Sequence, residues 1–276
     1  MSKKLSGLTA VVCTLNSESS LTHCLSSLKE FLDEIIVVDG GSTDKTLEIA
    51  SRFKVQILHD SGSGLGEARG LGLSKVKSEY VLNCGADNVI NVKVVRKMIE
   101  RLKAEPNIYG VSCQTVVEED VYIGKASNRI WRTKFNSGYA SMVGTPNIFR
   151  TQQLRKFGYI QSRGWSDDEE ICTRMREEDG ALFEILSDQC IEVGQASLKR
   201  QIYRFFHYGY SDYEIYSARK QAWSFRRKAK SILHPLRVEF LVPMRELEVT
   251  DKVYCFPLLV LATLLRYAGW IFRLSK

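Results

Sequence analysis

Residues 34–44 read EIIVVDGGSTD, and this stretch decides the fold. A short run of consecutive apolar residues is typical of a strand buried on both faces, and the glycines and hydroxyl residues after it indicate a loop that opens a helix. The same succession recurs along the first hundred residues. Strands are predicted at 8–14, 34–39, 55–60, 80–84 and 109–117, and helices at 21–32 with Ser17 as N-cap, 43–53, 65–76 and 92–103.

Alternation of strands and helices with short loops predicts right-handed crossovers and a parallel sheet, hence an α/β fold. Ligands of such sheets bind outside the carboxyl ends of the strands. Several polar residues stand where the apolar runs end, so we expect them to converge on one rim of the sheet. They are Asn16, Asp39 to Ser42, Asp60 and Gly85 to Asp87.

The composition is that of a folded globular protein: 44% of the 276 residues are hydrophobic and 26% are charged. The net charge of +7 is uneven, because residues 199–237 hold ten Lys/Arg and two Asp/Glu. This favours an anionic partner at one face over a protein coated in charge for nucleic acid.

The seven cysteines show no CxxC spacing, which indicates a reduced compartment and no zinc site. The N-terminus does not resemble a signal peptide, so we expect a cytoplasmic protein.

After residue 117 the alternation ends. Residues 118–145 are polar and rich in Gly, Ser and Asn, which predicts an irregular stretch covering a substrate. A helix at 151–157, an acidic helix at 167–178 and a short strand at 181–186 follow. We divide the chain into a catalytic domain, 1–198, and a basic, aromatic helical tail, 199–276.

Asp39 is the strongest candidate for ligand binding. A carboxylate fixed at a strand end can accept a hydrogen bond from a uracil N–H or a ribose hydroxyl, beside a helix N-terminus that favours anions. Capping by Ser42 or Thr43 explains the hydroxyls but leaves Asp39 unexplained.

Two alternatives, in which a glycine-rich loop binds a phosphate, are weaker. Residues 62–67 lack the third glycine of a dinucleotide fingerprint, and residues 40–46 lack P-loop spacing.

Two further acidic positions are candidates for chemistry. Asp87 follows a strand end and is suited to hold Mg²⁺ or Mn²⁺ on a diphosphate, although an Asp-Asn turn explains it equally simply. Residues 167–170 place four acids at a helix start, where acids ordinarily complement the helix dipole. One of the two aspartates can instead act as a general base for an acceptor hydroxyl.

Together and in this order, five segments resemble an inverting nucleotide-sugar glycosyltransferase of the GT-A fold, glycosyltransferase family 2. The opening VVCTLNSE is similar to V-x-P-T-Y-N-x-E, IVVDGGSTD to V-V-D-D-G-S-T-D and GEAR to G-x-A-R-N. YVLNCGADN is similar to Y-x-x-x-L-D-A-D-D and DDEEICTRM to E-D-x-x-L-x-x-R-L. These segments are residues 11–18, 36–44, 66–69, 80–88 and 167–175.

The resemblance implies roles for residues at the matching positions. Asp168 would be the base and Asp87 would bind Mn²⁺ or Mg²⁺, with His207 a possible further ligand. The donor would be a nucleoside-diphosphate sugar, with a UDP-sugar favoured. Its binding residues would be Thr14, Asn16, Glu18, Asp39, Ser42, Arg69, Asp87, Arg200 and Arg204. This chain departs from the family pattern at Gly40, Gly70 and Gly85, and Gly85 replaces the first carboxylate of the metal motif.

Two other classes of protein stay open. A nucleotidyltransferase would need a phosphate-binding loop after its first strand, and residues 13–20 contain no Gly, Lys or Arg. A non-catalytic sugar-binding or nucleic-acid-binding module would keep its function when Asp168 is replaced by Asn.

The tail has its own alternatives. Nine aromatic residues accompany the ten cations of residues 199–237, a pattern compatible with RNA stacking, a packed helical arm or a membrane interface. Residues 253–272 are mostly apolar, with Arg266 as their one charge. Arg266 in lipid is costly, so an in-plane or re-entrant amphipathic helix on the cytosolic face of the membrane is favoured over a span. A buried helix or an oligomer contact is the alternative. We expect a glycan or lipid-linked acceptor, and no nucleic-acid partner.

Overall fold

The computed structural model describes residues 4–62, 64–160 and 167–275. Its contacts group the chain into two compact units. The first unit comprises residues 1–116 and 136–194, and the second comprises residues 117–135 and 195–276. The sequence-based division after residue 198 differs from this grouping, because residues 117–135 contain a helix, Tyr122–Lys134, that packs with the C-terminal helices.

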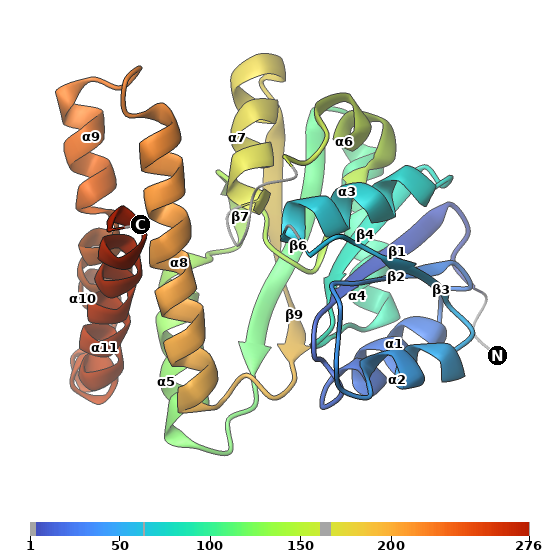
Figure 1. Cartoon of the computed structure of the whole chain (residues 1–276), viewed down its shortest axis with the longest axis horizontal. Coiled ribbons are helices and arrows are strands. Elements are labelled where there is room, and N and C mark those ends of the chain that lie inside the picture. The colour runs from blue at the N-terminus through green and yellow to red at the C-terminus, as the bar shows by residue number, and fades with distance from the viewer. Residues whose placement is uncertain (1–3, 63, 161–166, 276) are drawn as a thin grey trace. The chain divides into compact units, whose positions relative to one another are not determined.

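The first unit is built on a mixed sheet with the strand order β3-β2-β1-β4-β8-β6-β9-β5, and β7 pairs with β9 (Figure 1). The strands β1 to β4 are parallel to one another, as predicted. Their bounds are Leu8–Thr14 for β1, Ile35–Asp39 for β2, Gln56–His59 for β3 and Tyr80–Gly85 for β4. Thr14 is opposite Asp39, and Cys13 is opposite Gly85, so these strand ends meet at one rim.

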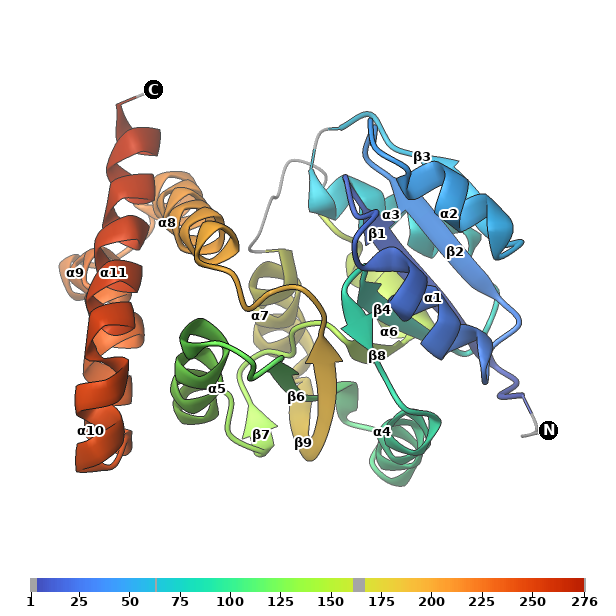
Figure 2. The ribbon, with the colours of Figure 1, turned by 90° about the horizontal axis from the view of Figure 1, so that it is seen from below.

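Alternation of side chains across the parallel strands produces two apolar cores. Val12 and Val37 face one core and Val11 and Val38 face the other, because successive residues of a strand point to opposite faces. Helices α1 (Leu21–Lys29) and α4 (Val92–Ala104) contribute to the first core. The second core receives residues of α3 (Leu65–Lys75), α6 (Thr151–Phe157) and α7 (Asp167–Asp179), and Figure 2 shows the same sheet from below.

The other half of the sheet is antiparallel, which the strand–helix alternation did not predict. Strand β8 (Asn147–Arg150) lies antiparallel to both β4 and β6 (Ile108–Val117). The strand expected at 181–186 is longer, β9 (Leu182–Glu192), and pairs antiparallel with β5 (Asn88–Val89) and β7 (Gly138–Ala140). The chain enters β8 from a loop and not from a crossover helix, so no right-handed crossover sets its direction.

Two predicted helix caps are wrong. Helix α1 has Ser20 at its N-cap, and the carbonyl of Ser17 accepts from the N–H groups of Ser20 and Leu21, so Ser17 forms a turn before the helix. Helix α2 (Thr46–Arg52) begins three residues later than predicted. Its first N–H is bonded by the Asp44 carboxylate at 3.0 Å, which leaves the Ser42 hydroxyl for another partner.

The second unit is helical. Its elements are α5 (Tyr122–Lys134), α8 (Leu198–Arg219), α9 (Phe225–Ile232), the π-helix η1 (Leu236–Leu241), α10 (Val242–Glu246) and α11 (Val249–Leu274). The expectation of an irregular stretch at 118–145 is therefore wrong for residues 122–134. Apolar residues of α5 at helical spacing, among them Ala126 and Ile130, pack into a third core with Cys255 and Leu259 of α11.

Candidate active site at the carboxyl ends of the parallel strands

Asp39 is fully buried at the end of β2, and four hydrogen bonds surround its carboxylate. Its Oδ1 accepts from the hydroxyls of Ser42 at 2.5 Å and Thr14 at 3.1 Å. Its Oδ2 accepts from the backbone N–H groups of Gly41 at 3.0 Å and Ser42 at 2.9 Å. Since a carboxylate has about four acceptor sites, a nucleoside that bonds to Asp39 must displace one of these donors. The Ser42 hydroxyl is the simplest to displace, because its O–H can turn to another acceptor while the backbone N–H donors are fixed.

The loops after β1 and β2 are held together by polar side chains. Asn16 accepts from the Thr43 N–H at 2.9 Å, and its own N–H donates to the Ser42 hydroxyl at 2.8 Å. Glu18 accepts from the Lys45 N–H at 3.1 Å, and the Glu18 N–H donates to Asp44 at the same distance. Asn16 adopts a left-handed backbone with φ of 50°, a conformation that Asn tolerates better than most residues. The predicted group Thr14, Asn16, Glu18, Asp39 and Ser42 is thus brought together.

Arg69 of α3 binds the two aspartates at the start of α7. Its Nη1 contacts Asp167 Oδ2 at 2.5 Å and also bonds to Asp168 Oδ1. The Arg69 and Asp167 side chains are only 6% and 1% exposed, whereas that of Asp168 is 15% exposed. Neighbouring carboxylates outweigh burial and raise the pKa of Arg69, so this cation is fixed between the two acids. The resemblance suggested a role for Arg69 on the nucleotide, and the structure shows it paired with carboxylates.

Asp167 is a buried carboxyl with one oxygen unsatisfied. Burial raises its pKa to about 7, the charge of Asp168 adds to this increase, and Arg69 opposes it. Within the part of the chain that the structure describes, its Oδ1 has no hydrogen-bond partner. An unpaired oxygen in such a position disfavours the ionised form.

Cys13 links these groups in space. Its thiol pKa is raised to about 12, mainly by burial, and the charges of Arg69, Asp167, Asp60 and Asp168 also act on it. Cys13 is the neighbour of Val38 on one side and Gly85 on the other. Charged residues from the loop after β3, from α3 and from α7 therefore lie close enough to the end of β1 to act on Cys13; of these, only Asp60 was among the residues predicted for the rim.

The turn after β4 carries the candidate metal ligand, Asp87. The Gly85 N–H donates to Asn88 Oδ1 at 2.7 Å, and the Val193 N–H donates to the Asp87 carbonyl at 2.8 Å. A Cβ at position 85 would lie 2.6 Å from Asp87 Oδ1, so the Asp87 carboxylate occupies the space that a side chain at position 85 would need. Asn88 Nδ2 is buried and has no hydrogen-bond partner among the residues that the structure describes.

These residues fit a metal only in part. Mg²⁺ commonly binds one or two protein carboxylates and completes its shell with substrate phosphates and water, so Asp87 suffices as the protein's ligand. Among the described residues no cluster of three or more His, Cys, Asp or Glu is arranged to hold a metal ion. His207, the other suggested ligand, lies in the second unit, where its ring stacks on Tyr203 at 4.1 Å and burial lowers its pKa.

The predicted cations beyond residue 198 also lie in the second unit. Arg204 is buried and its guanidinium lies over the Trp131 ring, 4.9 Å from the centroid. The Arg200 N–H donates to the Ser197 side chain at the start of α8. These contacts belong to the packing and capping of that unit.

Sequence reasoning missed the polar residues beneath the rim. Asn83 donates to Asn147 at 2.9 Å and to the Tyr159 hydroxyl at 3.1 Å, and Arg69 lies 5.9 Å from the centroid of the Tyr159 ring. Asn83 and Asn147 are both buried. The signals in the sequence were an Asn inside the apolar run YVLNC and another Asn directly before the apolar pair of NIF.

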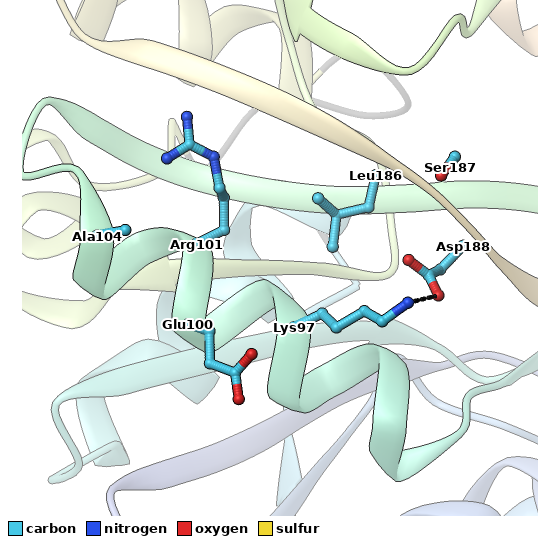
Figure 3. A pocket seen from close by; sticks show the side chains of 7 residues that line it. All are labelled: Lys97, Glu100, Arg101, Ala104, Leu186, Ser187 and Asp188. Atoms are coloured by element: carbon cyan, nitrogen blue, oxygen red, sulfur yellow. Dashed lines mark hydrogen bonds and ion pairs between the residues drawn. The ribbon is translucent and has the colours of Figure 1, made fainter.

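A shallow groove elsewhere on the first unit is not part of this site. It lies between α4 and β9, and the Lys97–Asp188 ion pair of 2.6 Å crosses it (Figure 3). Arg101, which also lines it, is paired with Glu184 at 2.5 Å. None of its lining residues belongs to the rim.

Solved structures share this fold. A mannosyltransferase from Pyrobaculum calidifontis in complex with GDP-Man and Mn²⁺ superposes with a TM-score of 0.63 at 16% identity, over 97% of this chain and 87% of that one. The S. aureus TarS fragment 1–349 in complex with UDP-GlcNAc gives a TM-score of 0.55 at 16% identity, over 96% and 89% of the two chains. At this identity the likeness establishes the GT-A fold.

Curated relatives agree in sequence. The glycosyltransferase GlyG of Streptococcus pneumoniae is 29% identical over 190 residues, which cover 58% of this chain and 62% of the relative. The poly(ribitol-phosphate) β-N-acetylglucosaminyltransferase TarS of Staphylococcus aureus is 34% identical over 99 residues, 31% of this chain and 17% of the relative. The chain thus spans less than two thirds of the length of these relatives. Residues 9–162, more than half of the chain, match the family described as "Glycosyl transferase family 2", and the protein belongs to that family of transferases.

Proposed function

We propose that the protein transfers a sugar, with inversion, from a nucleoside-diphosphate donor to a hydroxyl of a glycan or lipid-linked acceptor. The observation that carries this proposal is the Arg69 clamp on Asp167 and Asp168 at the rim of the parallel strands. It fixes a partly exposed carboxylate, Asp168, beside a fully buried one. A general base must be rigidly held and still reachable by the acceptor, and Asp168 meets both conditions.

In this mechanism Asp168 takes the proton of the acceptor hydroxyl. Its Oδ1 bonds to Arg69, so Oδ2 is the oxygen assigned to the acceptor. The acceptor oxygen then forms a bond to the anomeric carbon as the bond from that carbon to the diphosphate oxygen breaks. Attack from the face opposite the leaving group inverts the anomeric configuration, and the electron pair leaves with the nucleoside diphosphate.

The donor's nucleoside is assigned to the joined loops after β1 and β2. Thr14, Asn16, Glu18 and Ser42 supply polar groups there, and Asp39 is an acceptor once the Ser42 hydroxyl turns away. A UDP-sugar is the favoured donor, since TarS was solved in complex with UDP-GlcNAc. The mannosyltransferase, by contrast, was solved in complex with GDP-Man. Whether the donor carries uracil or guanine is therefore the first point to test.

Asp87 is assigned to Mg²⁺ or Mn²⁺ on the donor diphosphate. When bound, such an ion neutralises charge that develops on the leaving group. Gly85 leaves Asp87 as the carboxylate of this turn, so we expect weaker metal binding than a two-carboxylate motif provides. The buried Asn88 Nδ2 is a donor suited to a phosphate oxygen.

The second unit is assigned to the cytosolic surface of a membrane. Helix α11 is long and apolar enough to cross a bilayer by length and composition, which is weak evidence alone. The basic segment before it favours an anionic surface. Such a location suits an acceptor that is presented by the membrane.

The test compares wild-type protein with the D168N variant, using a panel of nucleoside diphosphates and their sugars with and without Mn²⁺. Asp168→Asn should lower turnover by at least about 100-fold, the range typical of general base catalysis, while the dissociation constant of the donor measured by calorimetry stays within about twofold. Full activity of D168N would contradict the proposal. Release of pyrophosphate from a nucleoside triphosphate would instead favour a nucleotidyltransferase.

A further inference from the structure

We propose that α9, with the exposed apolar stripe of α11, is a docking surface for the face of a bilayer containing anionic phospholipid. This inference rests on the membrane contact in the proposed function and identifies the residues and the lipid charge responsible. It concerns the second unit alone.

Helix α9 has the amphipathic pattern of a helix that lies in a membrane interface. Phe225, Ala229 and Ile232 recur at i, i+4 and i+7, so they share one face. None of the residues of α9 is buried, and Phe225 and Ile232 are 83% and 42% exposed. An apolar helical face left in water stabilises nothing in this unit, whereas insertion below lipid headgroups would bury it.

Cations flank this apolar face. Residues 215–238 contain seven Lys/Arg and no Asp/Glu, and four of these cations lie within α9 itself. The four are Arg226, Arg227, Lys228 and Lys230. A second copy of the chain would bring like charges together on this surface, while anionic lipid complements them. Charge complementarity therefore selects the bilayer over a homodimer as the occupant.

Helix α11 extends the apolar surface. Val249, Val253, Phe256, Leu264 and Ile271 follow one another at multiples of the helical repeat and are 48–75% exposed. The Tyr267 hydroxyl donates to the Ile232 carbonyl at 3.1 Å, which ties the stripe of α11 to the end of α9. Figures 1 and 2 show both helices beside α8.

The opposite face of α11 excludes a transmembrane orientation. Arg266 is buried there, with Nε 2.6 Å and Nη2 2.9 Å from the two carboxylate oxygens of Asp212, and its Nη1 bonds to Glu239. Lys134 also pairs with Glu239. A spanning α11 would carry these charges into lipid or leave them without partners, and either costs several kcal/mol or more.

Close packing fixes the same face to α8. A Cβ at Gly209 would collide with the backbone carbonyl of Arg266, and one at Gly269 would collide with that of Phe206. The two helices therefore touch along their backbones, and α11 presents one side to α8 and the other to its surroundings. An in-plane helix requires this division into a packed side and an outward side.

The test is flotation of the full chain with vesicles of neutral phosphatidylcholine, with or without 30% phosphatidylserine. We expect binding to the anionic vesicles only, weakened as NaCl rises from about 0.05 to 0.5 M, because exposed charges are screened. The quadruple variant R226Q/R227Q/K228Q/K230Q should bind at least about tenfold more weakly, since a cation near an anionic surface strengthens partitioning about fivefold. Phe225→Ser should weaken binding to the same vesicles without a change of charge.

The matched control is K75Q/K77Q/K93Q/K103Q, which removes four exposed lysines of the first unit and the same net charge. It should bind vesicles like wild type. Both quadruple variants should keep wild-type hydrolysis of a soluble donor, so loss of docking is distinguishable from loss of the transferase. Equal binding by the α9 variant and wild type would overturn the proposal. Tighter binding to single-stranded RNA than to vesicles would also overturn it. So would a dimer that forms with rising protein concentration while the chain fails to bind vesicles.

Discussion

At the scale of the residue, the candidate site depends on the guanidinium of Arg69, which pairs with both Asp167 and Asp168. Arg69 is buried with two carboxylates, so at least one of them is held against its preference for water. Asp167 bears that cost, because it is the more buried and has an unpartnered oxygen. Asp168 keeps some access to solvent, 15% of its side chain being exposed, as its proposed role as the base requires. Two adjacent aspartates thus acquire different properties from their surroundings alone.

The raised pKa of Asp167 predicts how the free energy of unfolding changes with pH. Its pKa is raised to about 7 in the folded chain, against an ordinary value of 3.8. Between these values the folded state binds the extra proton, so the contribution of Asp167 to the free energy of unfolding falls as pH rises from about 4 to 7. Urea unfolding of wild type and D167N across pH 4–8 measures this. We expect the stability of wild type relative to D167N to decrease with pH over that window.

Asp179 serves as a control, because its pKa is shifted in the opposite direction to that of Asp167. Its bond to Lys156 lowers its pKa, so it contributes stability above its ordinary pKa and loses that contribution in acid. The pair is exposed, and the effect of D179N should be small. Curves for wild type and D167N that stay parallel from pH 4 to 8 would contradict the account of Asp167.

Residue roles were only partly predictable from sequence. Strand ends can be read from apolar runs, so Thr14, Asn16, Asp39 and Asp87 could be assigned to the rim. That Arg69 pairs with Asp167 and Asp168 could not be inferred by spacing, since about a hundred residues separate them. Nor could the four donors on Asp39 be inferred, since three depend on the geometry of the turn at Gly41 and Ser42 and the fourth, the Thr14 hydroxyl, comes from the neighbouring strand.

At the scale of the element, α3 shows why its glycines are not equivalent. Gly72 faces β1 and β2, where an added Cβ would collide with Val11 and approach Val38 to 3.2 Å. Gly70, two residues earlier, has nothing within 4 Å of such a Cβ. The helix therefore packs closely against the sheet at one position and is open at the other.

Alanine at these two positions should have opposite effects. G72A should destabilise the protein by about 1–3 kcal/mol, because it overpacks a filled core. G70A should stabilise by up to about 1 kcal/mol, because alanine favours the helix over glycine. Chemical denaturation of the two variants and wild type gives both values. Equal effects of the two substitutions would show that α3 does not approach β1 as described.

The parallel elements were predicted well because each is encoded locally. Strand β1 has the predicted bounds, and β2, β3 and β4 differ by one or two residues. Strand β6 was also predicted to within one residue, but the strands β5, β7 and β8, the second half of β9, and helix α5 were not predicted. The partners of β8, and the core that receives α5, lie far away in sequence, and a polar surface disguises an amphipathic helix such as α5.

At the scale of the whole molecule, the two units differ in charge, and each core formed by the described residues belongs to one unit. The second unit contains nineteen Lys/Arg and nine Asp/Glu, while the first contains twenty and twenty-three. The two cores of the sheet consist of first-unit residues, and the third consists of second-unit residues. The excess positive charge of the chain is therefore a property of its helices and not of the catalytic sheet.

Because the two units have separate cores, we expect a substitution in one unit to lower the stability of that unit alone. G72A should increase amide hydrogen exchange in β1, β2 and β4 and leave α8 and α11 unchanged. G209A, which forces α8 away from the Arg266 carbonyl, should increase exchange in α8 and α11 and leave the strands unchanged. The reason is that substitutions without shared partners act additively and locally, each on its own cooperative unit. Exchange measured by mass spectrometry resolves these segments, and the G70A variant reports any general effect of the substitution. If G209A loosened β1 as much as α8, the chain would unfold as one cooperative unit, and the second unit would be a structural support of the sheet instead of an independently stable surface.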